Sequence, residues 1–381
     1  MLQKKTVIWL VTVLLTILIT GCNTQHEENE VIDRTTSYEN RERVIMSMHE
    51  LGLEEIHVHE IEGPPNNYML TCERLRGYVD VALLQDNNEN IIDYQHEEGF
   101  IQINLETPQD QIVVSLFNAC HVDRPILVKV FFNYEETPFR VAGSEIYFDD
   151  LLLKVSSGHV VNIPINLSSN LEKNEYLNIL SIGAFPNPEH HTMKDDSFTI
   201  SNMFGEMHSW AISYGGSERL KLDVPFMTPP TRLVGIESFG LVVQQYGQAW
   251  SENHGVYLMS EQHLQVKSGD TVDLYFYINP GSLIPEWRET VVTEYLIVAM
   301  LNWQQIQLNA LPFLRVEAIH EEKAFGITDR GHFTIIAPEE PGLYEFVAFI
   351  IFNPIDIHDD VHHWGVQFTF PFTIEVTKAS D

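Results

Sequence analysis

Runs of apolar residues, some alternating with polar residues and some continuous, dominate the chain from Gly77 onward. Asn, Asp, Gly and Pro separate these runs, and β-branched and aromatic residues are frequent within them, which is the pattern of β-strands. The pattern offers no long amphipathic helix that could cover a parallel sheet. We therefore expect an all-β fold in which each domain consists of two packed sheets. Representative runs are YVDVALL, FIQINLE, ILVKVFF, VVNIPINL, EYLIVAML and YEFVAFIIF.

One strand-turn-strand segment recurs in the second half of the chain. LKVSSGHVVNIPI, which starts at Leu153, aligns with LQVKSGDTVDLYF, which starts at Leu264, at a constant offset of 111 residues. A match of Glu175–Leu177 with Glu294–Leu296 follows in the same order. Each unit predicts two strands that present their apolar side chains to one face, as in a β-sandwich. The alternative is that any two strand-turn-strand units look alike.

The repeat predicts two tandem β-sandwich domains. Domain one is expected to span residues 70–225 and domain two residues 232–381. The Pro-rich segment 226–231, within VPFMTPPTR, is expected to link them, because proline favours extended linker conformations.

The N-terminal residues have the composition of an export signal. Lys4 and Lys5 precede an apolar run from Val7 to Ile19. This run is shorter than the roughly 20 apolar residues that a helix needs to cross a bilayer, although an uncleaved N-terminal anchor is an alternative.

The four residues Ile19-Thr20-Gly21-Cys22 resemble the lipobox of bacterial lipoproteins. The resemblance implies that residues 1–21 are removed as a signal peptide and that Cys22 carries diacylglycerol and palmitate chains. Two acyl chains anchor a protein stably where a single chain is marginal. We therefore expect a protein held at the cell membrane, on its extracytoplasmic face.

The segment that follows Cys22 is polar and acidic. Residues 22–43 contain almost no large apolar residue and are expected to form a flexible tether with a reach of roughly 25 Å. Within residues 44–69, apolar residues at Val44, Met48 and Leu51 predict a short amphipathic helix, followed by a strand, that packs on domain one.

Two cysteines remain if Cys22 is lipidated. Cys72 and Cys120 can form a disulfide in an exported protein, which would be worth roughly 4 kcal/mol in the chain-entropy model. Two separate buried thiols are the alternative.

The segment APEEPGLYEF, residues 337–346, resembles the corner between strands E and F of immunoglobulin-like domains. In that fold a tyrosine after the turn donates its hydroxyl to upstream backbone, and the resemblance gives this position to Tyr344. Phe346 stands where antibody domains have a cysteine, so the resemblance implies the fold without the disulfide between the sheets.

The charge balance excludes one class of partner. The chain has 54 acidic residues and only 22 lysines and arginines, which gives a formal charge of −32. A polyanion of this size is repelled by DNA and RNA. Nucleic-acid binding is therefore excluded.

A histidine-rich segment is the sharpest chemical feature of the sequence. IDIHDDVHHWG brings together imidazoles and carboxylates that can share a zinc or copper ion at a spacing of four residues. The candidate ligands are His358, Asp360, His362 and His363. The alternative is a solvated acidic loop between two strands, with no cofactor.

Catalytic motifs are incomplete throughout the chain. No His-Glu pair continues to a second histidine as zinc peptidases require, and the sequence contains no G-x-S-x-G motif. We therefore expect a membrane-anchored, non-catalytic module that binds an extracellular protein or glycan. The alternative is an exported metal-binding or metal-delivery protein.

Overall fold

The structure is a computed structural model that forms an all-β body. The described residues form 23 strands, and none of them belongs to a helix that could span a membrane. These residues are 45–57, 79–84, 102–104, 112–118, 123–167, 176–186, 206–213, 215–216, 218, 221–234, 241–245, 263–278, 292, 294–318, 327–354, 366–368 and 372–378.

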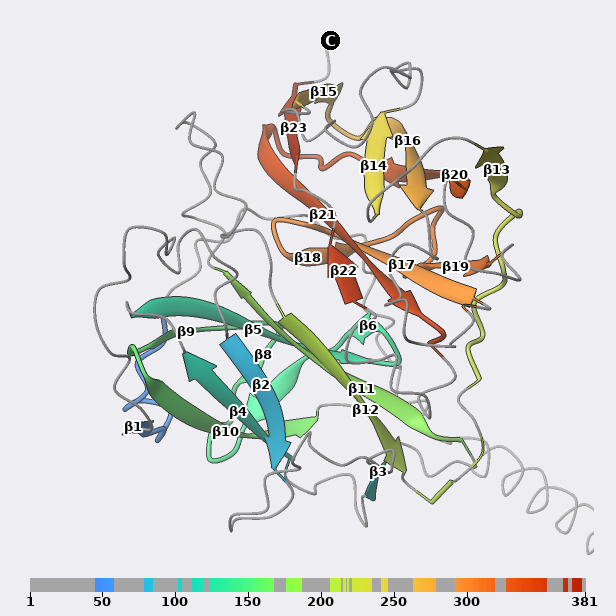
Figure 1. Ribbon diagram of the computed structural model, residues 1–381. Coiled ribbons are helices and arrows are strands. Elements are labelled where there is room, and N and C mark those ends of the chain that lie inside the picture. Colours follow the sequence, from blue (N-terminus) through green and yellow to red (C-terminus); the bar gives the residue numbers. More distant parts are fainter. Residues whose placement is uncertain are drawn as a thin grey trace, which may run out of the picture. The chain divides into compact units, whose positions relative to one another are not determined.

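The first sandwich uses the strands from β1 to β12 (Figure 1). One sheet has the order β2 (Val79–Leu84), β4 (Ile112–Asn118), β10 (His159–Leu167), β7 (Phe139–Val141) and β8 (Tyr147–Phe148), with β1 (Glu55–His57) paired to β10. The other has the order β3 (Gln102–Asn104), β12 (Glu206–Ser213), β11 (Asn178–Pro186), β5 (Arg124–Phe132) and β6 (Glu135–Glu136), with β9 (Leu151–Val155) paired to β5.

The second sandwich uses the strands from β13 to β23 (Figure 1). One sheet has the order β13 (Thr231–Val234), β20 (Ile327–Ile336), β16 (Thr271–Ile278) and β14 (Val242–Gln245). The other has the order β15 (His263–Lys267), β23 (Phe372–Thr377), β21 (Gly342–Phe352), β17 (Glu294–Leu301) and β18 (Gln304–Ile306), with β19 (Leu314–Glu317) paired to β17 and β22 (Val366–Phe368) paired to β21.

The two sandwiches share an immunoglobulin-like strand order except at one edge. In the first, β2, β4, β10 and β7 take the places of strands A, B, E and D, and β5, β11 and β12 those of C, F and G. In the second, β14, β16 and β20 take the places of A, B and E, and β17, β21 and β23 those of C, F and G. The edge place beside E belongs there to β13, which comes first along the chain and is therefore not a D strand. Each sandwich also has a strand parallel to its G strand, β3 in the first and β15 in the second. The predicted fold class, two tandem immunoglobulin-like sandwiches, is therefore confirmed.

The repeat at an offset of 111 residues pairs strands that are not equivalent. It aligns β9 and β10 with β15 and β16, whereas β10 is the E strand of the first sandwich and β16 is the B strand of the second. The local similarity arises because both pairs pass from one sheet to the other through a glycine with a φ of 71°, Gly158 and Gly269. A left-handed backbone of this kind favours glycine in any strand-turn-strand unit.

The predicted short helix is a single turn instead. The backbone N–H of Leu51 donates to the carbonyl of Ser47 at 3.3 Å, and Gly52 ends the turn with a φ of 66°. Met46 lies in a β-bridge to Leu153, so among the described residues the turn begins only after Met46. The apolar residues Met46, Met48 and Leu51 do pack against the core of the first sandwich.

The predicted corner in the second sandwich is confirmed. Tyr344 is buried, and its hydroxyl donates to the carbonyl oxygen of Glu340 at 2.9 Å. Phe346, at the position of the antibody cysteine, stacks on Phe372 of the neighbouring strand β23 in the same sheet, with ring centroids 4.7 Å apart.

The change from one sandwich to the other falls between Ser213 and Thr231. The predicted linker, 226–231, lies at the end of this segment, and the detailed domain boundaries stay predictions. The linker is fixed to the second sandwich, because Met227 N–H donates to the carbonyl of Arg315 at 2.9 Å and the Arg315 guanidinium lies 4.1 Å from the Phe226 ring centroid.

Candidate functional site

The two sandwiches share a hydrophobic core between them. It contains seven buried residues from the first sandwich, eight from the second and Leu222 from the connecting segment. In β5 and β11 these residues alternate with residues that face the core of the first sandwich. Strands β5, β11, β17 and β21 are therefore buried on both faces, which explains why three of them are almost continuously apolar. The residues of the shared core are Leu127, Phe131, Tyr134, Leu152, Ile179, Phe185, Met207, Leu222, Leu296, Val298, Met300, Trp303, Phe313, Val347, Phe349 and Ile351.

Two equivalent hairpins face each other across this shared core. The β5–β6 turn is formed by Asn133 and Tyr134, and the β17–β18 turn by Asn302 and Trp303, all four with positive φ between 47° and 69°. Two central residues with positive φ are the mark of a type I′ turn, whose twist matches that of the strands. The motifs FFNYEE and MLNWQQ, 169 residues apart, are therefore structural equivalents.

The hairpins contact each other reciprocally. Glu136 and Gln305 each follow the turn asparagine by three residues. The backbone N–H of Glu136 donates to Oε1 of Gln305 at 2.5 Å, and the backbone N–H of Gln305 donates to Oε2 of Glu136 at 2.8 Å. Such an exchange is typical of a contact with approximate two-fold symmetry.

The side-chain amide of Gln305 stabilises the contact between the two hairpins with two further hydrogen bonds. Its Nε2 donates to the carbonyl oxygens of Tyr134, at 3.0 Å, and Pro312, at 2.9 Å. One side chain therefore bonds both sandwiches, and all its polar atoms have partners.

The aromatic residue of each turn packs on the opposite sandwich. The buried Tyr134 hydroxyl donates to the carbonyl oxygen of Pro354 at 2.8 Å, and burial, with a further contribution from the charge of Glu294, raises the pKa of Tyr134 well above its usual range. Trp303 stacks on Phe185, with ring centroids 4.9 Å apart. Both turns therefore contribute apolar area and orientation to the same interface.

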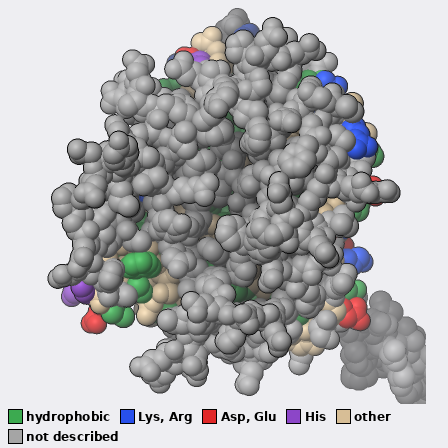
Figure 2. Space-filling view, viewed as in Figure 1, with side chains coloured by type: hydrophobic (Ala, Val, Ile, Leu, Met, Phe, Trp, Pro, Cys, Tyr) green, Lys and Arg blue, Asp and Glu red, His purple; other side chains and the backbone are tan. Residues whose placement is uncertain are grey.

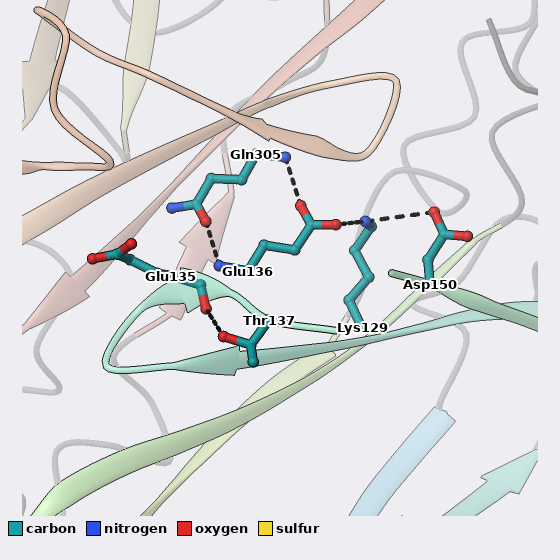
Figure 3. Close-up of polar contacts among 6 residues, drawn as sticks. All are labelled: Lys129, Glu135, Glu136, Thr137, Asp150 and Gln305. Carbon is teal, nitrogen blue, oxygen red and sulfur yellow. Dashed lines mark hydrogen bonds and ion pairs between the residues drawn. The ribbon is translucent and has the colours of Figure 1, made fainter. Parts of the chain in front are cut away.

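A lysine lies inside this interface (Figure 3). Lys129, in the middle of β5, is fully buried, and its ammonium group contacts Oε1 of Glu136 and lies 3.5 Å from Oδ2 of Asp150. The two carboxylates retain 16% and 19% side-chain exposure. The position equivalent to Lys129 in the second sandwich is Val298, so the fold itself does not require a charge here. We define Lys129, Glu136, Asp150 and Gln305 as the interface cluster.

Glu345, in β21, is on the same face of its strand as the shared-core residues Val347 and Phe349. Its backbone N–H donates to Oδ1 of Asn302 at 2.8 Å, and burial raises the pKa of its carboxyl group to about 7. The folded protein therefore binds a proton that the unfolded chain releases near pH 4.5.

This shift predicts a loss of stability with rising pH. Because the folded pKa of Glu345 lies above the unfolded value, its contribution is most favourable below about pH 4.5, falls as the pH rises to about 7, and is constant above. Replacing Glu345 with glutamine should raise the free energy of unfolding at pH 8 by about 1 to 2 kcal/mol. Urea denaturation at pH 5 and pH 8 measures this, with Glu317→Gln, at an exposed position at the end of β19, as the control. An equal gain at both pH values would contradict the explanation.

The residues that the sequence selected as sites lie outside the described part of the chain. These are Cys22, the cysteines Cys72 and Cys120, and the metal candidates His358, Asp360, His362 and His363. Lipidation, the disulfide and metal binding stay predictions. Among the residues that the structure describes, no group of three or more His, Cys, Asp and Glu is arranged to hold a metal ion.

The sequence pattern did not predict the interface cluster as a site. Its one visible signal was Lys129, a charged residue within the otherwise apolar run ILVKVFF. The described surface is mixed: Figure 2 shows hydrophobic, acidic and basic side chains on one face. The exposed large apolar residues come from separate segments, namely Ile45, Ile56, Ile146, Tyr147, Phe226, Ile336 and Leu343.

Comparison with known proteins identifies no family. No family model and no curated protein matches the chain. The C-terminal domain of the Streptococcus agalactiae AgI/II polypeptide BspA matches with 9% identity and a TM-score of 0.22, over 77% of this chain and 99% of that one. The C-terminal domain of the Streptococcus pyogenes antigen I/II-family protein AspA matches with 10% identity and a TM-score of 0.21, over 79% and 99%. Likenesses this distant carry no argument about function.

Proposed function

We propose that the protein is a lipid-anchored bacterial module that binds an extracellular protein or glycan and has no catalytic role. The observation that supports a binding module is the shared core, which joins the two sandwiches into one preformed body. A preformed body binds a partner with little loss of conformational entropy. Loops at the ends of immunoglobulin-like sandwiches are the usual place for such recognition.

The anchoring part of the proposal rests on the N-terminal sequence. Cys22 follows a short apolar run, and the acidic segment up to residue 43 gives the body a reach of roughly 25 Å. Loss of Lys4 and Lys5 with the signal changes the formal charge from −32 to −34. The charge holds the body away from anionic headgroups while the lipid keeps it near the membrane.

Replacing Cys22 with alanine is expected to abolish acylation and cleavage together. In a bacterium that processes lipoproteins, the full chain should incorporate labelled palmitate and begin at residue 22, whereas the Cys22→Ala chain should remain unlabelled and retain residues 1–21. Intact mass and palmitate labelling measure both effects. Cys72→Ala is the matched control and should behave as the unsubstituted chain. Labelling that survives in Cys22→Ala would refute the anchor.

The metal alternative is tested on the same preparation. Native mass spectrometry before and after chelation would reveal a bound zinc or copper ion. If an ion is present and is lost in the triple variant His358→Ala/His362→Ala/His363→Ala, metal binding replaces the proposal of a plain binding module.

A further inference from the structure

We propose that His57 and His159 bind a zinc ion on the surface of the first sandwich. His57 is the last residue of β1 and His159 the first of β10, and the two are direct partners in the antiparallel pairing of these strands (Figure 1). Opposite residues of such a pair project from the same face of the sheet, so the two imidazoles meet. The site is independent of the lipid anchor, of the proposed partner and of the histidine segment that contains His358.

The distance between the two rings fits one shared zinc ion. Their centroids lie 5.0 Å apart, with the ring planes at 77° to each other. With zinc–nitrogen bonds of about 2.0 Å, two imidazoles on a tetrahedral ion have centroids about 5.2 Å apart. A right angle at the metal, as in square-planar copper(II), would bring the centroids to about 4.5 Å. The observed separation matches the tetrahedral arrangement more closely and therefore favours zinc.

Hydrogen bonding leaves a ring nitrogen of each histidine available to a metal. Nδ1 of His159 lies 2.8 Å from the carbonyl oxygen of Ser157. Because a carbonyl oxygen only accepts, Nδ1 carries the proton, and Nε2 of the neutral ring keeps its lone pair. A backbone carbonyl that fixes the tautomer in this way is typical of zinc-bound histidines. The side chain of His57 has no hydrogen bond among the described residues, so its ring can rotate about χ2, which leaves the centroid in place.

A carboxylate supplies negative charge beside the pair. Asp123 Oδ1 accepts the backbone N–H of Ser157 at 3.3 Å, and its Oδ2 lies 3.2 Å from Nζ of Lys154. The charge of Asp123 also interacts with His159 through space. A negative charge at this place favours a cation bound to the ring, without Asp123 being a ligand.

Solvent completes the coordination of the ion. No third His, Cys, Asp or Glu joins the two histidines among the residues that the structure describes. His57 is exposed and His159 half-buried, so water reaches the site. Zinc accepts imidazole and water together, and an open zinc site keeps water at its free positions. The bound ion also holds β1, a strand of only three residues, on β10.

Zinc titration of the full chain by calorimetry tests the proposal. The chain carries His358→Ala, His362→Ala and His363→Ala, so that the histidine segment does not contribute. The tightest binding step should involve one zinc ion per chain. His57→Asn and His159→Asn should each weaken this step at least roughly tenfold. The double variant should weaken it no further, because loss of either ligand already removes the chelate.

A third histidine provides the matched control. His263 is exposed, and its Nε2 lies 2.7 Å from Oε2 of Glu375, so it presents a single imidazole beside a carboxylate. His263→Asn should leave zinc binding unchanged. A background chain that binds no zinc would overturn the proposal. Equal weakening in all three single variants would also overturn it, because such binding would not depend on the pair.

Hydrogen exchange followed by mass spectrometry tests the position of the ion. Zinc should slow amide exchange in β1 of the background chain, because an ion that binds only the paired strands opposes their separation. The slowing should be absent in the His159→Asn chain. Slowing that persists in His159→Asn would place the ion elsewhere and contradict the assignment.

Discussion

Replacing Trp303 with alanine should lower the free energy of unfolding by about 3 to 5 kcal/mol, the usual cost of removing a large buried aromatic side chain. Trp303 is 2% exposed and stacks on Phe185 of the opposite sandwich. The substitution leaves a cavity inside the shared core, so the loss should affect both sandwiches. Urea denaturation followed by far-ultraviolet circular dichroism measures the change.

Phenylalanine at the same position is the matched control. The indole N–H of Trp303 is buried and has no hydrogen-bond partner among the described residues. Trp303→Phe therefore removes no hydrogen bond and should cost less than about 1.5 kcal/mol. If Trp303→Ala costs no more than Trp303→Phe, the ring does not hold the sandwiches together.

A methyl group at Gly183 should destabilise the same interface from the other side, by about 2 to 3 kcal/mol. Gly183 lies in β11, and a Cβ built on it would be 2.3 Å from Cε2 of Phe185. The ring must therefore move, and its movement disturbs the stacking on Trp303.

A double variant separates this clash from a general effect on the strand. Phe185→Leu makes room for the added methyl group, so Gly183→Ala should cost less in the Phe185→Leu chain than in the unsubstituted chain. We expect the two costs to differ by at least about 1 kcal/mol, as is found for residues in direct contact. Strictly additive costs would show that the clash with Phe185 is not the cause.

The fold class follows from the sequence because strand pattern and turn residues are local signals. Alternating runs such as HVVNIPINL mark strands with one buried face, and the corner at Tyr344 identifies a pair of consecutive strands. Equivalence between the sandwiches is a non-local property, and a Ser-Gly turn is too common to establish it. The pair FFNYEE and MLNWQQ carries the correct register, but an asparagine followed by an aromatic residue is an unusual signal for a tight hairpin.

The sequence indicated that some strands are buried on both faces, but it did not indicate that the two sandwiches share a core. The apolar runs EYLIVAML and GLYEFVAFIIF indicate strands that are buried on both faces, yet such a pattern does not identify what covers the second face. The interface cluster depended on Glu136 and Gln305 meeting across 169 residues, which no local pattern encodes. Of the residues in the interface cluster, only Lys129 is recognisable in the sequence, as a charged residue within an apolar strand.

Calorimetric unfolding of the full chain tests most directly whether the two sandwiches form one body. The shared core predicts a single transition whose calorimetric and van't Hoff enthalpies agree, because neither sandwich can unfold without exposing the face of the other. Trp303→Ala should lower the midpoint of this transition. Two separate transitions in the unsubstituted chain, one for each sandwich, would contradict the account.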